Sequence, residues 1–225
     1  MRDGRFITFE GGEGAGKSTQ IRLLAARLRE VAREVVVTRE PGGTPLAEKL
    51  RAVILSGGAK QFGPLGEAML FSAARIDHID RIIRPALSRG AYVLCDRFAD
   101  STRAYQGAKG GVDPTMLKAM EMVALAGVTP ELTFILDLPP EIGLERARHR
   151  RGEGQADRFE SEDTAFHAQL RQKFLDIAEA EPKRCCVIDA ARPPEEVAEA
   201  IWKEVSERLL SERASDEASD GKIWA

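Results

Sequence analysis

The chain has 225 residues, which is enough for one well-buried core or at most two small domains. Its hydrophobic fraction of 43% beside 31% charged residues is ordinary for a globular protein. The formal net charge of −3 argues against a protein that binds nucleic acid through a general electrostatic field, so we expect no nucleic-acid partner.

The cysteines, the apolar segments and the first residues together predict the compartment. Three cysteines form no even disulfide framework, and no C-x-x-C pair is present. No apolar segment approaches the roughly 18–20 residues that cross a bilayer, and the beginning MRDGRFITFE is too short and too acidic for a signal peptide. We therefore expect a cytoplasmic protein with no membrane partner.

Short apolar runs rich in β-formers alternate with longer helical patterns along the chain. The predicted strands are Phe6–Glu10, Val35–Thr38, Ala91–Cys95, Leu132–Leu138 and Cys185–Asp189. The predicted helices are Lys17–Val31, 66–88, Pro114–Ala126, Pro140–Arg150, Thr164–Glu179 and Pro194–Leu210. This alternation predicts an α/β fold with a parallel sheet covered on both faces. We expect one domain over residues 1–210, followed by a polar, frayed tail over 211–225.

The first predicted strand leads into GGEGAGKS, which matches the pattern G-x-x-x-x-G-K-[ST] between a strand and a helix. Glycines let the backbone wrap a phosphate with its N–H groups pointing inward, and the dipole of the following helix attracts anions. Lys17 would reach the terminal phosphates, and the Ser18 hydroxyl would hold Mg²⁺. The residues predicted to bind ATP are Gly11, Gly12, Glu13, Gly14, Ala15, Gly16, Lys17, Ser18 and Thr19.

A P-loop alone leaves several classes of protein open. A regulatory GTPase should carry an Asn-Lys-x-Asp motif that reads guanine, and the chain contains no asparagine. An ATP-driven motor or transporter subunit would need partner domains and usually a longer chain. The remaining class is a small phosphotransferase, which needs a second anion site, a metal-binding carboxylate and a mobile cover that excludes water.

All three requirements have candidate residues. The turn TREPGGT presents Arg39 after the second strand as a phosphate ligand. Asp96 and Arg97 end the third strand, where Asp96 suits the Mg²⁺ shell and Arg97 suits a phosphate. The cover is predicted over residues 145–160, whose Gly-rich centre suits hinge motion, although a solvated, charged helix end is the alternative. The arginines of this lid are Arg146, Arg148, Arg150, Arg151 and Arg158.

Five segments occur in the order found in one enzyme family: GGEGAGKST, TREPGGT, AMLFSAAR, DRFADSTRAYQG and DRFE. Over residues 5–205 the chain resembles the thymidylate kinases, which phosphorylate dTMP to dTDP with ATP and Mg²⁺ in dTTP synthesis for DNA replication. The resemblance implies a three-layer P-loop NTPase fold of the nucleoside monophosphate kinase type, with a five-stranded parallel sheet, commonly as a homodimer. Two alternatives stay open: a kinase for another nucleoside monophosphate, and a catalytically silent nucleotide-binding protein.

The resemblance also implies which residues bind the thymine base. Phe71 corresponds to the aromatic ring that stacks on the base. Arg75 lies one helical turn later, on the same helix face, and corresponds to a residue that hydrogen-bonds the base. Ser101 and Gln106 correspond to further positions that contact the base.

The phosphate and the sugar of the acceptor have implied partners as well. Arg39 and Arg97 correspond to arginines on the dTMP phosphate. Tyr105 corresponds to the residue packed where a ribose 2′-hydroxyl would lie. Glu13 corresponds to the P-loop carboxylate near the 3′-hydroxyl, and Glu10 is a weaker candidate for the same site.

Members of the family differ in the cation that assists transfer. Some place a basic residue directly after the P-loop carboxylate, whereas others leave glycine there and use arginines of the lid. Gly14 follows Glu13, so the chain resembles the second arrangement, which is common in bacterial enzymes. Catalysis is assigned to Lys17, Arg97, Arg158 and Arg151, with Arg158 as the first choice within the lid. The residues expected to be surface or packing histidines, with no catalytic role, are His78, His149 and His167.

Overall fold

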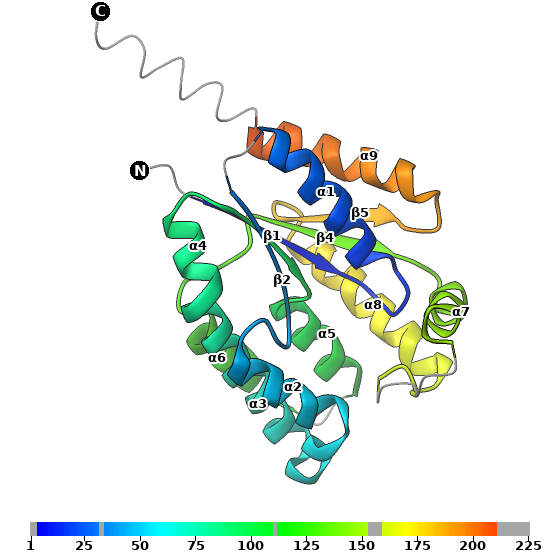
Figure 1. Cartoon of the computed structure of the whole chain (residues 1–225). Coiled ribbons are helices and arrows are strands. Elements are labelled where there is room, and N and C mark those ends of the chain that lie inside the picture. Colours follow the sequence, from blue (N-terminus) through cyan, green and yellow to red (C-terminus); the bar gives the residue numbers. More distant parts are fainter. Residues whose placement is uncertain (1–3, 32–33, 110–111, 153–158, 211–225) are drawn as a thin grey trace, which may run out of the picture.

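Five parallel strands form one sheet in the order β2-β3-β1-β4-β5 (Figure 1). The computed structural model describes residues 4–31, 34–109, 112–152 and 159–210. The strands are β1 Arg5–Glu10, β2 Val35–Arg39, β3 Tyr92–Asp96, β4 Leu132–Asp137 and β5 Cys185–Asp189. All five predicted strands are confirmed to within about a residue at either end, because each is a nearly continuous apolar run. The central strands β1, β3 and β4 are buried, whereas the edge strands β2 and β5 are partly exposed. The α/β class and the five-stranded parallel sheet are confirmed as well.

Helices cover both faces of the sheet. The helix α1 and the C-terminal helix α9 lie on one face, and α4, α5, α6 and α8 lie on the other (Figure 1). The helices are α1 Lys17–Val31, α2 Pro45–Leu55, α3 Gly63–His78, α4 Arg84–Ser88, α5 Ala99–Lys109, α6 Pro114–Leu125, α7 Pro140–Arg151, α8 Thr164–Ala180 and α9 Pro194–Val205. The described residues also form short 3-10 or π-type turns, which are η1 Gly58–Phe62, η2 Ile79–Ile83 and η3 Ser206–Leu210. Within the described residues, no helix combines the length and the apolar character that a membrane span requires.

The long helix predicted over residues 66–88 is interrupted. It consists of α3, the π-type turn η2 and α4, and Pro85 lies in the first turn of α4. A proline has no N–H for the helical ladder, and its ring crowds the carbonyl one turn earlier, so the helix widens there instead of continuing regularly.

Two helices are present that the apolar pattern did not predict. The segment after β3 carries no apolar helical period, and its residues from Ala99 onward form α5. Helix α2 begins at Pro45, and the Thr44 side chain caps it by accepting a hydrogen bond from the Ala47 N–H. The pair of a Thr cap and a proline in the first turn is the signal that could have revealed α2.

The register of the sheet brings the ends of three strands to one level. Asp96 of β3 lies opposite Arg39 of β2 on one side and Phe9 of β1 on the other. In parallel sheets, ligands bind outside the carboxyl ends of the strands. The loops that follow β1, β2 and β3 therefore emerge side by side at this edge.

Candidate active site

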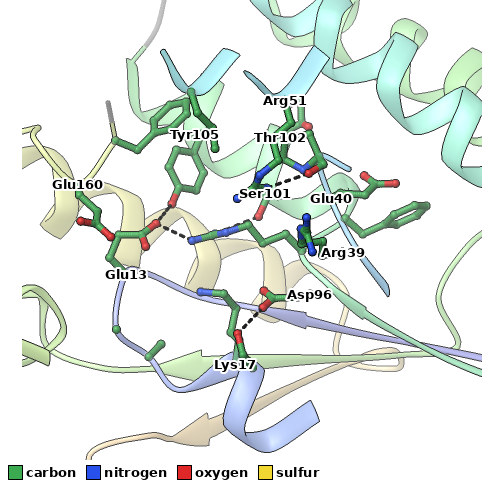
Figure 2. A pocket seen from close by; sticks show the side chains of 18 of the residues that line it. Glu13, Lys17, Arg39, Glu40, Arg51, Asp96, Ser101, Thr102, Tyr105 and Glu160 are labelled. Atoms are coloured by element: carbon green, nitrogen blue, oxygen red, sulfur yellow. Dashed lines mark hydrogen bonds and ion pairs between the residues drawn. The ribbon is translucent and has the colours of Figure 1, made fainter. Parts of the chain in front are cut away.

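A cavity of ≈ 450 Å³ opens at the carboxyl ends of β1, β2 and β3. Figure 2 shows Lys17 and Asp96 at one end of it and Tyr105, Arg51 and Thr102 at the other. The lining residues come from the P-loop, the turn after β2, and helices α2, α3 and α5, together with Arg150, Phe159 and Glu160. Residues that are far apart in the sequence thus share one space.

The P-loop connects β1 to the first turn of α1. The Lys17 ammonium donates hydrogen bonds to the carbonyl oxygens of Gly11 at 3.1 Å and Gly12 at 2.8 Å. Burial, and then the nearby positive charge of Arg97, lower the pKa of Lys17 to about 8. Because its partners are neutral carbonyls, the ammonium can exchange them for the stronger charge of a phosphate.

Ser18 and Asp96 form an oxygen-rich pair at the start of α1. The Ser18 hydroxyl donates a hydrogen bond of 2.9 Å to Oδ2 of Asp96. One carboxylate and one hydroxyl fit Mg²⁺, which usually keeps several waters and takes its other ligands from substrate phosphates. A protein cage is not required, and the described residues contain no group of three or more His, Cys, Asp or Glu that could hold a metal.

Arg97 lines the cavity and is held by four contacts. Its Nη2 donates to Oε1 of Glu13 at 2.7 Å, and its Nη1 donates to the Gly11 carbonyl at 3.1 Å and to the Ser101 hydroxyl at 3.2 Å. Its guanidinium also lies 5.2 Å from the ring centre of Tyr105. Burial opposes the charge, but Tyr105 and Glu13 outweigh it and raise the pKa of Arg97.

The backbone of Arg97 has φ 67°, in the left-handed region that non-glycine residues seldom adopt. Such outliers persist where surrounding contacts over-determine them, and they cluster at functional sites. The contacts of the guanidinium therefore hold the residue in a conformation that it would otherwise avoid.

Glu13 is the partner of both Arg97 and Tyr105. The Tyr105 hydroxyl donates a hydrogen bond of 3.0 Å to the same carboxylate oxygen that accepts from Arg97. Burial alone would raise the pKa of Glu13, but Arg97 and Lys17 lower it to about 2. Glu13 is thus ionised at neutral pH and ties the P-loop to α5.

The far end of the cavity is an apolar slot. Pro41, Leu55, Phe71 and Phe159 are among its lining residues. The rings of Phe71 and Phe159 have centres 6.4 Å apart. A flat heteroaromatic ring can stack on an aromatic side chain of this kind, because it gains dispersion contacts across its face.

Arg75 lies at the edge of this slot and is almost fully buried. Its Nε donates to Oε2 of Glu40 at 2.8 Å, and its Nη2 donates to the Phe98 carbonyl and the Thr102 hydroxyl, both at 3.0 Å. Glu40 and Thr102 were not identified from the sequence. Nothing in the pattern TREPGGT reveals that its glutamate is buried against α3.

The cavity brings most of the predicted site residues together. Arg39 is one of them: it lines the cavity and forms an exposed ion pair of 2.8 Å with Glu48. Other predicted residues do not line the cavity or are not described. Gln106 does not line it: the side chain is buried, and its Nε2 has no hydrogen-bond partner among the described residues. Arg158 and the side chain of Arg151 lie outside the described residues.

Two arginines line the cavity that were not chosen from the sequence. Arg150, at the end of α7, lies 3.5 Å from Glu160 and contributes to the low pKa of Glu13. Arg51 of α2 donates a hydrogen bond of 2.8 Å to the Pro41 carbonyl. Arg150 was one of five lid arginines without a distinguishing signal, and Arg51 lies on a helix that the sequence reading missed.

Gly14 is required by the packing of the P-loop on α7. It has φ 66°, and a Cβ added there would lie 2.0 Å from the carbonyl oxygen of Gly143 in the first turn of α7. A Cβ added at Gly143 would in turn lie 2.3 Å from the carbonyl oxygen of Glu13. Because these are backbone atoms, they cannot move aside as the end of a side chain can. No side chain fits at position 14 while α7 keeps its place.

A phosphate-binding loop that opens into the same space as an arginine-rimmed apolar slot is what a kinase of small nucleotides requires, and this defines the class of the protein. The sequence profile described as "Thymidylate kinase" matches residues 9–201. The chain belongs to the thymidylate kinase family.

Individual relatives agree with this assignment. The chain is 56% identical over 208 residues to a thymidylate kinase of a Bradyrhizobium species, with 92% of each chain covered. It is 54% identical over 216 residues to a thymidylate kinase of Nitrobacter winogradskyi, which covers 96% of this chain and 94% of the relative. The crystal structure of a thymidylate kinase from Ehrlichia chaffeensis superimposes with a TM-score of 0.73 at 35% identity, over 91% of this chain and 99% of that one.

Glu10 is a buried carboxyl directly behind the site. It accepts hydrogen bonds from the Phe98 N–H at 2.7 Å and from the Ser101 hydroxyl at 2.6 Å. Burial, followed by the charge of Asp100, raises the pKa of Glu10 to about 7. Ser101 is predicted to contact the base, but its hydroxyl already donates its hydrogen bond to Glu10.

We predict that Glu10 makes the stability of the protein depend on pH. Its pKa rises from 4.5 to about 7 on folding, so the folded state holds the proton more tightly and the free energy of unfolding increases as the pH falls from 7 towards 4.5. Glu10→Gln cannot ionise and should lack this contribution. Between pH 8 and pH 5 the wild type should gain roughly 1–3 kcal/mol relative to the variant, measured by urea unfolding. Parallel pH profiles of the two proteins would contradict the raised pKa.

Proposed function

We propose that this chain transfers the terminal phosphoryl group of ATP to dTMP, releasing dTDP and ADP, as a step in dTTP synthesis for DNA replication. One observation carries the proposal: the P-loop and the slot beside Phe71 and Arg75 open into a single cavity, with Arg97 between them. Membership of the thymidylate kinase family supports dTMP as the acceptor.

On the donor side, we assign the triphosphate to Gly11–Thr19. Lys17 would leave the P-loop carbonyls and pair with the terminal phosphates. Ser18 and Asp96 would hold Mg²⁺, which supplies charge neutralisation and orientation for the phosphoryl group when it is bound. The hydrogen bond between Ser18 and Asp96 supports this assignment, because it brings two suitable oxygens together before any metal arrives.

On the acceptor side, we assign the dTMP phosphate to Arg39 and Arg97. The base would stack on Phe71 and accept a hydrogen bond from Arg75. The sugar would lie between Tyr105 and Glu13, and the contact between these two side chains supports a common role. Ser101 and Gln106 stay proposed base contacts from the family resemblance, although each would have to approach the ligand from its present buried or hydrogen-bonded position.

The transfer step needs cations where charge develops on the migrating group. Lys17 and Arg97 supply two, and Gly14 leaves the P-loop without a third. Arg158 and Arg151 stay our proposed catalytic residues of the lid, and we add Arg150, which lines the cavity beside Glu160.

We predict that dTMP is the preferred acceptor and that Lys17→Ala abolishes its phosphorylation. ADP release should be measured with dTMP, dUMP, UMP, AMP and GMP for both proteins, with thermal unfolding as the check that the variant is folded. The loss should exceed about 10³-fold, because Lys17 neutralises charge in the transition state. Faster turnover of another acceptor would contradict the assignment of the slot, and near wild-type turnover of Lys17→Ala would contradict the P-loop assignment.

Arg150→Ala should lower kcat by at least about tenfold while the KM for dTMP changes little. An arginine that reaches the phosphoryl group only on closure stabilises the transition state more than the bound substrate. Arg148→Ala is the matched control, because Arg148 is on the same helix but lines a separate surface hollow beside His149. Equal losses in the two variants would point to general charge or helix stability, and no loss in either would exclude Arg150 as the catalytic cation.

We also propose that the chain forms a homodimer through α3 and α6. Large apolar side chains are exposed on these two neighbouring helices: Leu65, Met69, Ile76, Met116, Met122 and Val123. Gathered apolar side chains on a surface mark a contact site more often than scattered ones do. A second copy of the chain, related by two-fold symmetry, would cover them.

Val123→Glu should convert the dimer into a monomer, seen as a halved mass in light scattering at micromolar concentration. Val123 is 74% exposed in the single chain, so a charge there harms the fold little but would have to be desolvated in an interface. Val31→Glu, at the end of α1 where the side chain is 55% exposed, is the control and should stay dimeric. A monomeric wild type, or a dimeric Val123→Glu variant, would exclude this interface.

We propose a single domain over residues 1–210 and a cytoplasmic location. The sheet takes strands from Arg5 to Asp189, which supports one domain. The three cysteines are free thiols, and burial raises the pKa of Cys95 and Cys185. Such protonated, buried thiols behave as packing residues, as expected in a reducing compartment.

A further inference from the structure

His78 lies at the end of α3, in a line of polar contacts that the proposed mechanism does not use. Its Nδ1 lies 3.0 Å from Oε1 of Glu40, and its Nε2 lies 2.6 Å from the Thr38 hydroxyl. The other oxygen of Glu40 accepts the hydrogen bond from Nε of Arg75. The histidine is thus one contact away from a residue that lines the cavity.

These side chains are removed from solvent. His78 is 0% exposed, Arg75 3% and Glu40 5%. A buried polar atom that loses its hydrogen bond leaves its partner without compensation, which costs more than the bond itself contributes. The contact of His78 with Glu40 therefore constrains Glu40 and, through it, the Arg75 guanidinium.

The chemistry of the carboxylate fixes the direction of one hydrogen bond. A carboxylate oxygen only accepts, so Nδ1 of His78 carries the proton that is donated to Glu40. Nε2 lies within hydrogen-bond distance of the Thr38 hydroxyl, which can donate or accept.

The backbone of the turn after β2 also packs closely against the imidazole of His78. A Cβ added at Gly43 would lie 2.9 Å from both Cδ2 and Nε2 of His78. The ring is therefore held between the backbone of this turn on one side and Glu40 on the other. Its rotation would require the turn that follows Arg39 to move.

We propose that His78 is a positioning residue for the acceptor site: through Glu40 it fixes the plane of the Arg75 guanidinium at the edge of the slot. Nε of Arg75 donates to the Glu40 carboxylate, and Nη2 donates to the Phe98 carbonyl and the Thr102 hydroxyl. Nη1 is the nitrogen of Arg75 for which the described residues provide no hydrogen bond, so it is the donor left for a ligand. The inference rests on the proposed function, in which Arg75 binds the base.

The matched test uses two amides in place of the imidazole. The side-chain nitrogen of Asn is at the δ position, like Nδ1, and that of Gln is at the ε position, like Nε2. His78→Asn therefore retains a donor for Glu40, whereas His78→Gln retains only the contact to Thr38. Thr38→Val removes the hydroxyl that contacts Nε2 of His78 and leaves the contact between His78 and Glu40.

His78→Gln should raise the KM for dTMP about tenfold, the effect of weakening one charged hydrogen bond in the ligand site. The kcat and the KM for ATP should stay within about twofold of the wild type. His78→Asn and Thr38→Val should keep the KM for dTMP within about twofold as well, even where they lower the melting temperature. This split between Gln and Asn is a result that a merely structural histidine would not give.

Equal losses in the Gln and Asn variants, or losses that follow the melting temperature, would overturn the proposal. Should His78→Gln fail to fold, Glu40→Gln takes its place and must raise the KM for dTMP in the same way, and an unchanged KM there also overturns it. Arg75→Ala distinguishes a wrong assignment of the base site from a wrong role for His78. If Arg75→Ala leaves the KM for dTMP unchanged, the assignment of the base site fails, whereas a raised KM with a silent His78→Gln overturns the role of His78 alone.

Discussion

Asp96 pairs with Arg39 on one side and with Phe9 on the other, and this register of β2, β3 and β1 determines where every loop of the site emerges. Parallel strands hydrogen-bonded at one level end at one level, so the P-loop, the turn after β2 and the start of α5 share an edge. A slip of one residue between β1 and β3 would turn the side chains of one strand to the opposite face of the sheet and separate Asp96 from Ser18.

Charge balance is the second constraint on this edge. Among the described residues around the P-loop, Lys17 and Arg97 face Glu13 and Asp96, while the raised pKa of Glu10 removes much of a further negative charge near neutrality. Paired charges can be buried where isolated ones cannot. Substrate phosphates add several negative charges to this balanced set, so they need cations from the rim of the cavity.

Arginines at the rim are available for that role because their present partners are weak. The Arg39 and Arg150 side chains are 54% and 66% exposed, and they pair with carboxylates at 2.8 and 3.5 Å. Exposed ion pairs contribute roughly 0–1 kcal/mol, so a phosphate group replaces the carboxylate at little cost. Arg97 and Arg75 differ, since buried contacts already fix them and ligand binding can use their orientation without first creating it.

The sequence predicted those parts of the site that depend on local chemistry. The P-loop is a contiguous run with a fixed order of residue types, and the five apolar runs became the five strands, so both could be recognised without tertiary information. Helix α5 was missed because its cavity-facing side is polar, which removes the apolar periodicity that reveals a helix. The contacts from Thr38 through His78 to Glu40 join two segments about forty residues apart, and no pattern in either segment predicts that they meet.

The contact between Gly14 and Gly143 also limits how this enzyme can change. In the family's other arrangement a basic side chain stands directly after the P-loop carboxylate, and a single codon change would suffice to encode it. Here such a side chain would begin 2.0 Å from a backbone oxygen that no replacement at position 143 can remove. The two arrangements are therefore separated by a shift of the whole start of α7. A lineage could pass from one to the other only by remodelling that helix first, and until then the position after Glu13 stays without a side chain.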